Sequence, residues 1–79
     1  MQKSLHTDQH RILCELLREL RTDAKLTQVQ LAEAIDESQS MVSRVEVGER
    51  RLDILELRQW LAALDVSLRT FIGTLEKRL

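Results

Sequence analysis

Hydrophobic positions recur with helical spacing along most of the 79-residue chain. In residues 8–22 they share one helix face, at Ile12, Leu13, Leu16, Leu17 and Leu20. Four later segments keep this period, at about 27–35, 38–47, 53–64 and 68–79. The chain has no proline and two glycines, a composition that favours helices throughout. The pattern predicts an all-α fold of five helices in a single domain, 1–79, with the polar residues 1–7 flexible.

Residues that cap helices stand at the predicted boundaries. They are Thr27 with Gln30, Ser38, Gly48, and Asp53 with Glu56. A hydroxyl or carboxylate followed three residues later by Gln or Glu is the pattern of a capping box. Asp36 tolerates the left-handed conformation that ends a helix, and Gly48 suits the position just after one. The segment 27–47 is therefore predicted to be two short helices joined by a tight turn.

Two such helices form a helix-turn-helix arrangement, whose second helix can enter the major groove of DNA. On a helical wheel of residues 38–47, Met41, Val42 and Val45 fall on one side. The opposite side carries Gln39, Ser40, Ser43, Arg44 and Val47. An amide can pair with adenine, a guanidinium with guanine, and a hydroxyl with either base. The wheel alone leaves open an ordinary solvated polar face.

The rest of the composition narrows the class of protein. Trp60 and Phe71 are the only aromatic residues, too few for a platform that stacks single-stranded nucleic acid. Cys14 has no partner for an internal disulfide, and no apolar run is long enough to span a membrane, which favours a cytoplasmic protein. His6 and His10 lack further ligands for a metal site. No catalytic constellation is present, so we expect neither an enzyme nor a cofactor.

Net charge gives little support to DNA binding, because the formal value is −1. Binding depends, however, on the phosphates that are neutralised locally rather than on the total charge. A basic face on a slightly acidic protein therefore stays compatible with this composition.

The segment LTQVQLAEAIDESQSMVSRVEVGERRL resembles the phage-repressor (Cro-like, xenobiotic-response-element) helix-turn-helix family. The matching positions are Thr27-Gln28, Leu31-Ala32 and the stretch from Ser40 to Gly48. The similarity extends over about residues 17–68 and implies a five-helix, λ-repressor-like DNA-binding domain. Asp36 departs from the pattern, because the family usually has glycine there, and we expect it to be tolerated at some cost in strain.

The resemblance implies roles for individual residues. Gln39, Ser40 and Arg44 are expected to reach base edges, and Ser43 a base or a phosphate. Gln28 is expected to donate to a backbone phosphate and to brace Gln39. Arg50 and Arg51, in the loop after the motif, are also expected to contact the DNA backbone or to approach the minor groove. The alternative for these two arginines is a solvated loop that pairs with Glu49.

Two further residues are implied to be structural. In this family an arginine near the end of the first helix often pairs with the glutamate that precedes the glycine. Here these residues are Arg21 and Glu46, and the wheel places Glu46 at the edge of the core-facing side. The pair is predicted to hold the first helix against the second helix of the motif.

A homodimer is predicted from the last apolar stripe. The interface is expected to contain Leu55, Leu68, Phe71, Ile72, Leu75 and Leu79. The alternative is that these side chains pack within one chain. Two recognition helices about 34 Å apart read successive major grooves, so a dimer predicts a palindromic operator.

The function expected from the sequence is sequence-specific binding of double-stranded DNA by a small transcription regulator, a dimeric autorepressor. One alternative is the antitoxin of a toxin–antitoxin pair, in which the N-terminal segment or the last helix grips a toxin. Another is a controller protein of a restriction–modification system, which activates as well as represses.

Overall fold

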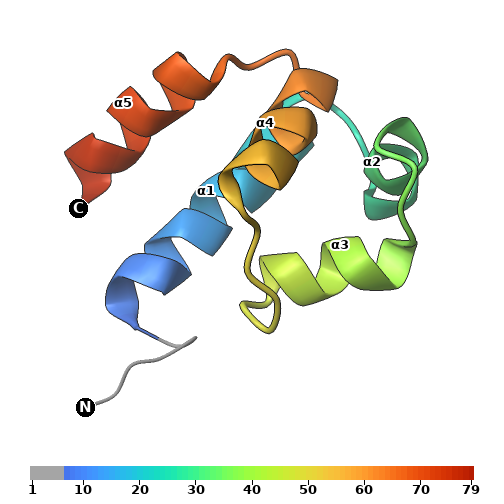
Figure 1. Cartoon of the computed structure of the whole chain (residues 1–79), viewed down its shortest axis with the longest axis horizontal. Helices are drawn as coiled ribbons and strands as arrows, with labels where there is room; N and C mark the ends of the chain where they lie inside the picture. Colours follow the sequence, from blue (N-terminus) through green and yellow to red (C-terminus); the bar gives the residue numbers. More distant parts are fainter. Residues whose placement is uncertain (1–6) are drawn as a thin grey trace.

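The computed structural model describes residues 7–79, which form five α-helices and no strand (Figure 1). They are α1 (Asp8–Asp23), α2 (Gln28–Ala34), α3 (Gln39–Glu46), α4 (Ile54–Ala63) and α5 (Leu68–Arg78). The predicted all-α, five-helix fold is confirmed. In Figure 1, α1 and α4 lie in the middle, with α2 and α3 on one side and α5 on the other.

The predicted flexible segment needs one correction, at Thr7. Residues 1–6 lie outside the described part of the chain, so their flexibility stays a prediction. Thr7 is an ordered N-cap, because its hydroxyl accepts the backbone N–H of His10 at 3.1 Å. The helix α1 therefore begins with a side-chain cap where we expected loose chain.

The predicted caps of the later helices are present. The Thr27 hydroxyl accepts the Gln30 N–H at 3.1 Å, and the Gln30 side chain accepts the Thr27 N–H at 2.9 Å. Asp53 and Glu56 form the same reciprocal box at the start of α4. Ser38 caps α3. Each box satisfies two backbone N–H groups that a helix start leaves without partners.

Each of the helices α1 to α4 is followed, two positions after its last residue, by a residue with positive φ; these residues are Lys25, Asp36, Gly48 and Asp65. After α2, the Asp36 N–H donates to Glu33 and the Glu37 N–H to Ala32, at 3.3 and 2.9 Å. These two bonds are those of a Schellman motif. Asp36 has a φ of 58°, so the position usually occupied by glycine keeps its left-handed conformation here.

We predict that Asp36→Gly stabilises the fold. Glycine removes the steric cost that a Cβ carries at positive φ, and the net gain is about 1 kcal/mol, or about 4–8 °C in Tm for a domain of this size. Thermal unfolding followed by circular dichroism measures the shift. Gly48→Ala is the control of opposite sign, because Gly48 has a φ of 87° and its replacement introduces the strain. Equal shifts in the same direction for both variants would contradict this account.

The core lies where the five helices meet. Its fully buried members are Leu16, Leu17, Leu31, Val42, Val45, Trp60, Leu61 and Phe71. The side of α3 predicted to face inward does so, since Met41, Val42 and Val45 are all buried. This packing fixes the rotation of α3 about its axis, and with it the residues that α3 presents to solvent.

Candidate nucleic-acid interface

The outer side of α3 carries the polar residues that the sequence places there. Gln39, Ser40 and Arg44 are exposed, and Ser43 is half-buried. Val47, just after the helix, is 61% exposed. In Figure 1 α3 runs along the outer edge of the molecule, with no other helix beyond it. The exposed residues Gln39, Ser40 and Arg44 are therefore accessible to a partner.

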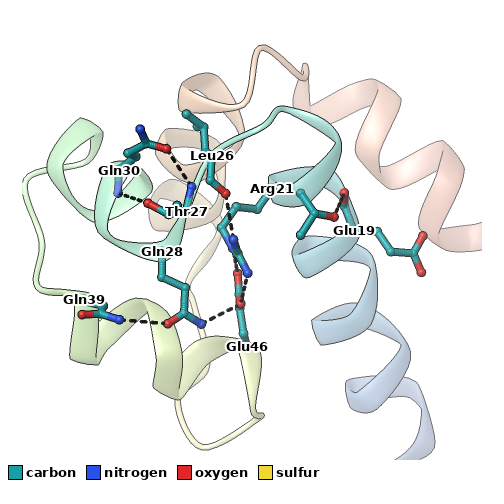
Figure 2. Close-up of polar contacts among 9 residues, drawn as sticks. Glu19, Arg21, Leu26, Thr27, Gln28, Gln30, Gln39 and Glu46 are labelled. Atoms are coloured by element: carbon teal, nitrogen blue, oxygen red, sulfur yellow. Dashed lines mark hydrogen bonds and ion pairs between the residues drawn. The ribbon is translucent and has the colours of Figure 1, made fainter.

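A buried ion pair holds α1 against α3. The Nε of Arg21 lies 2.6 Å from Oε2 of Glu46, and its Nη2 lies 3.1 Å from Oε1 (Figure 2). The third nitrogen, Nη1, donates to the carbonyl of Leu26 at 2.8 Å. The two side chains are only 10% and 3% exposed. The structure thus contains the predicted pair, in the bidentate geometry that makes arginine–carboxylate bonds strong.

The same carboxylate of Glu46 is connected through hydrogen bonds to the first turn of α3. Gln28 donates its Nε2 to Oε1 of Glu46 at 3.0 Å, and Gln39 donates its Nε2 to Oε1 of Gln28 at 3.5 Å. Figure 2 shows this row of side chains, which runs from Arg21 of α1 to Glu46 at the end of α3, then to Gln28 of α2 and to Gln39 in the first turn of α3. The predicted bracing of Gln39 by Gln28 is therefore present, and Glu46 extends it into the core.

The loop between α3 and α4 is more ordered than the sequence indicates. Arg50 donates through Nη2 to Oε2 of Glu56 at 3.0 Å, and through Nη1 to the carbonyl of Arg51 at 3.4 Å. The backbone N–H of Asp53 and the Arg50 guanidinium hold the pKa of Glu56 below its ordinary value. Arg50 thus pairs with Glu56, not with Glu49. Arg51 is exposed.

The contact between His10 and Gly48 was missed from the sequence, where His10 was considered only as half of a metal pair with His6. The His10 side chain is buried, with Nε2 3.3 Å from the carbonyl oxygen of Gly48 and 3.7 Å from Sγ of Cys14. Burial raises the pKa of the Cys14 thiol. The i, i+4 spacing of His10 and Cys14 was the available signal for a shared face. His6 lies outside the described residues, and within 7–79 no three potential metal ligands are grouped.

The predicted dimer surface is only partly available. Phe71 is a correction: it is 1% exposed and packs in the chain's own core, where α5 contacts α1 and α4. Leu68 and Leu75 are half-buried and also pack against this core. The outward-facing residues are Leu55, Ile72 and Leu79, at 73%, 38% and 55% exposure.

A shallow groove includes Leu55, the most exposed of these three residues. It is lined by Leu55, Arg58, Gln59, Ala62, Val66, Ser67 and Leu68. The groove therefore joins the outer side of α4 to the start of α5.

Among the described helices, none is long and apolar enough to cross a bilayer.

Comparison with known proteins identifies the class. The sequence model of the helix-turn-helix family matches residues 17–71. An XRE-family like protein from Pseudomonas syringae pv. tomato str. DC3000 is 33% identical, over 89% of this chain and 85% of that one, with a TM-score of 0.82. The chain therefore belongs to the XRE family of helix-turn-helix proteins. As such, it is a DNA-binding regulator of transcription.

The fold is also shared with a restriction–modification controller protein, C.Esp1396I. The wild-type protein is 24% identical over 91% of this chain and 95% of that chain, with a TM-score of 0.83. The same controller has been solved as a tetramer in complex with its natural 35-base-pair operator, and that structure matches with a TM-score of 0.82. A comparison with curated proteins gave no significant match.

Proposed function

We propose that this protein is a homodimeric repressor that binds a palindromic operator in double-stranded DNA and controls its own gene. The observation that carries the proposal is the exposed polar side of α3, held rigidly by its buried side and by the bonds of Glu46. Because repression follows from occupying a promoter, the proposal contains no catalytic step and no cofactor. It places the protein in the cytoplasm, with the DNA.

Each polar group of the outer side has a matching chemistry in the major groove. The Arg44 guanidinium suits O6 and N7 of guanine, and the Gln39 amide suits N6 and N7 of adenine. The Ser40 hydroxyl suits either base, and the half-buried Ser43 a base or the adjoining phosphate. Gln28, at the first turn of α2, is assigned a backbone phosphate as a second acceptor, and its bond to Glu46 leaves one hydrogen of its NH₂ group for that contact.

Both loop arginines are assigned to the sugar-phosphate backbone in this proposal. Arg50 reaches a phosphate only by exchanging its bond with Glu56, which lies 3.0 Å away. Glu56 therefore competes with DNA for Arg50 and lowers the number of phosphates that the loop neutralises.

This competition gives a prediction for Glu56→Gln. Glutamine keeps the capping box with Asp53 but loses the charge that holds Arg50. We expect one additional phosphate contact, which makes the slope of log K against log salt steeper by about 0.9. Binding titrations at several salt concentrations measure the slope. Glu76→Gln makes the same charge change on an exposed site of α5, and equal slopes for the two variants would refute the competition.

A second copy of the chain is proposed to cover the exposed apolar residues Leu55 of α4 and Ile72 and Leu79 at and near α5. One recognition helix buries too little surface for operator specificity. Two copies related by a two-fold axis place their α3 helices in successive major grooves, about 34 Å apart. The controller protein of the same fold binds its operator as a tetramer, which supports assembly on DNA.

The proposal is tested by fluorescence anisotropy on labelled DNA from immediately upstream of the gene. A scrambled duplex of the same composition is the control, and both are titrated at several salt concentrations. We expect a Kd of about 10⁻⁸ M or lower for the upstream duplex and binding weaker by about 10³-fold or more for the scrambled one. Equal, weak binding of both duplexes would contradict the proposal. It would direct the search to a protein partner, such as a toxin.

A further inference from the structure

We propose that Glu46 is a positioning residue for base readout: its buried carboxylate, acting through Gln28, sets the orientation of the Gln39 amide. This inference rests on the proposed function, in which Gln39 meets a base edge. It adds to Glu46 a role beyond the ion pair with Arg21. The observation behind it is the row of hydrogen bonds from Arg21 to Gln39 in Figure 2.

The Glu46 carboxylate determines which end of the Gln28 amide faces it, because a carboxylate can only accept hydrogen bonds. Glu46 is 3% exposed in its side chain, and two bonds from Arg21 prevent it from turning away. A neighbouring amide must therefore offer its NH₂ group. Gln28 does so, with Nε2 at 3.0 Å from Oε1 of Glu46. The reverse orientation brings an amide oxygen against a carboxylate oxygen and is repulsive.

The orientation of the Gln28 amide in turn determines the orientation of the Gln39 amide at the start of α3. With its NH₂ group turned to Glu46, Gln28 presents its Oε1 to Gln39. The Nε2 of Gln39 donates to this oxygen at 3.5 Å. This leaves Oε1 and the second amide hydrogen of Gln39 directed away from Gln28. The exposed end of Gln39 is thus an acceptor beside a donor, in a fixed order.

An acceptor beside a donor complements adenine, which offers the N6 amino group and N7 in the major groove. Guanine offers O6 and N7, both acceptors, so the fixed Oε1 of Gln39 meets a repulsive partner. An amide that rotates freely loses part of this discrimination, because it can turn its NH₂ group to guanine. The buried ion pair therefore contributes to the choice of base as well as to the fold.

The test uses Gln28→Met, which cuts the row between Glu46 and Gln39 and leaves the Arg21–Glu46 pair intact. Gln39→Ala first locates the base pair that Gln39 reads, as the position where discrimination is lost. Affinities are then measured for duplexes with A·T or G·C at that position. Gln9→Met, the same change at an exposed site of α1, is the matched control.

We expect Gln28→Met to lower the adenine-over-guanine affinity ratio by about tenfold, within the range that one bidentate pair contributes. Gln9→Met leaves the ratio unchanged. If Gln28→Met weakens both duplexes equally, Gln28 acts only on phosphate and the inference is overturned. If Glu46→Gln folds, as judged by circular dichroism, we expect it to lower the ratio as Gln28→Met does, and an unchanged ratio also overturns the inference.

A second readout separates this inference from the proposed function. In the protein without DNA, the side-chain amide resonances of Gln39 are expected to shift in Gln28→Met and to stay in place in Gln9→Met. No shift in Gln28→Met means that the row of bonds does not constrain Gln39, whether or not DNA binds. Absence of specific DNA binding by the wild-type protein, with the shift present, overturns the proposed function alone.

Discussion

Arg21→Ala is expected to lower the free energy of unfolding by about 3–5 kcal/mol, because it leaves a buried carboxylate without its cation. The Glu46 side chain is 3% exposed, so water cannot replace the lost partner. The variant also takes a donor from the carbonyl of Leu26. A small domain has a stability of only about 5–15 kcal/mol, so this loss is a large part of the total. Urea denaturation of the purified variant measures it.

Arg78→Ala is the matched control for this prediction. Arg78 forms the same two-bond pair with Glu19, at 3.0 and 3.1 Å, but the side chains are 40% and 53% exposed. Water can solvate the exposed Glu19 carboxylate once Arg78 is removed, so we expect a much smaller loss of stability in Arg78→Ala than in Arg21→Ala. The hydrogen bond from Arg78 lowers the pKa of Glu19. The pair's contribution to stability is therefore present at neutral pH and is lost as the pH falls through the lowered pKa of Glu19. Equal losses in Arg21→Ala and Arg78→Ala would refute the special role of the buried pair.

If the protein is the proposed dimer, Leu55→Glu is expected to convert it to a monomer and to weaken operator binding by about 10²-fold or more, because the second recognition helix is no longer linked to the first. Leu55 is 73% exposed and lines the groove at the start of α5. A buried, unpaired carboxylate in an apolar interface carries a high desolvation cost. Sedimentation equilibrium at tens of micromolar protein reports the assembly state, and anisotropy reports the affinity.

Ile54→Glu provides the control on the neighbouring residue. Ile54 is 56% exposed, is the first residue of α4 and does not line the groove. Glutamate in the first turn of a helix is favourable, so this variant is expected to stay folded and dimeric. A Leu55→Glu protein that sediments as wild type, or a wild-type protein that is monomeric at these concentrations, rules out this surface as the dimer interface.

The helices and their caps were predictable from the sequence because their causes are local. Thr27 and Gln30 satisfy each other's backbone groups within one turn, and this needs no tertiary information. The left-handed residue at the end of α2 was also predictable, since aspartate tolerates the αL region. Lys25 adopts the same conformation but was not predicted, because the bonds that close the end of α1 impose it there against the residue's own preference.

The packing of α5 was only partly predictable, and Phe71 shows why. Phe71 and Ile72 are adjacent, so they lie about 100° apart on the helix and belong to one broad apolar stripe. Periodicity identifies the stripe but cannot say which edge meets the chain's own core. The structure places Phe71 inside and leaves Ile72 38% exposed. That choice depends on how α5 docks on α1 and α4.

The site was predictable where the family pattern supplied the residues. The pairing of Arg21 with Glu46 followed from the resemblance, whereas the third bond of that carboxylate, to Gln28, did not. The partner of Arg50 was also missed, because the course of the loop decides between Glu49 and Glu56. His10 meets Gly48 across 38 positions of sequence, a contact that only the packing of α1 on α3 brings about.

Whether the outer side of α3 reads DNA sequence is measured most directly by comparing Arg44→Ala with the wild type on operator and scrambled duplexes. We expect Arg44→Ala to lose about 1–3 kcal/mol in binding free energy on the operator and almost none on the scrambled duplex. Lys77→Ala, which removes one positive charge from the last turn of α5, is expected to change neither. An equal loss on both duplexes, or no loss on the operator, would contradict the assignment of α3 as the recognition helix.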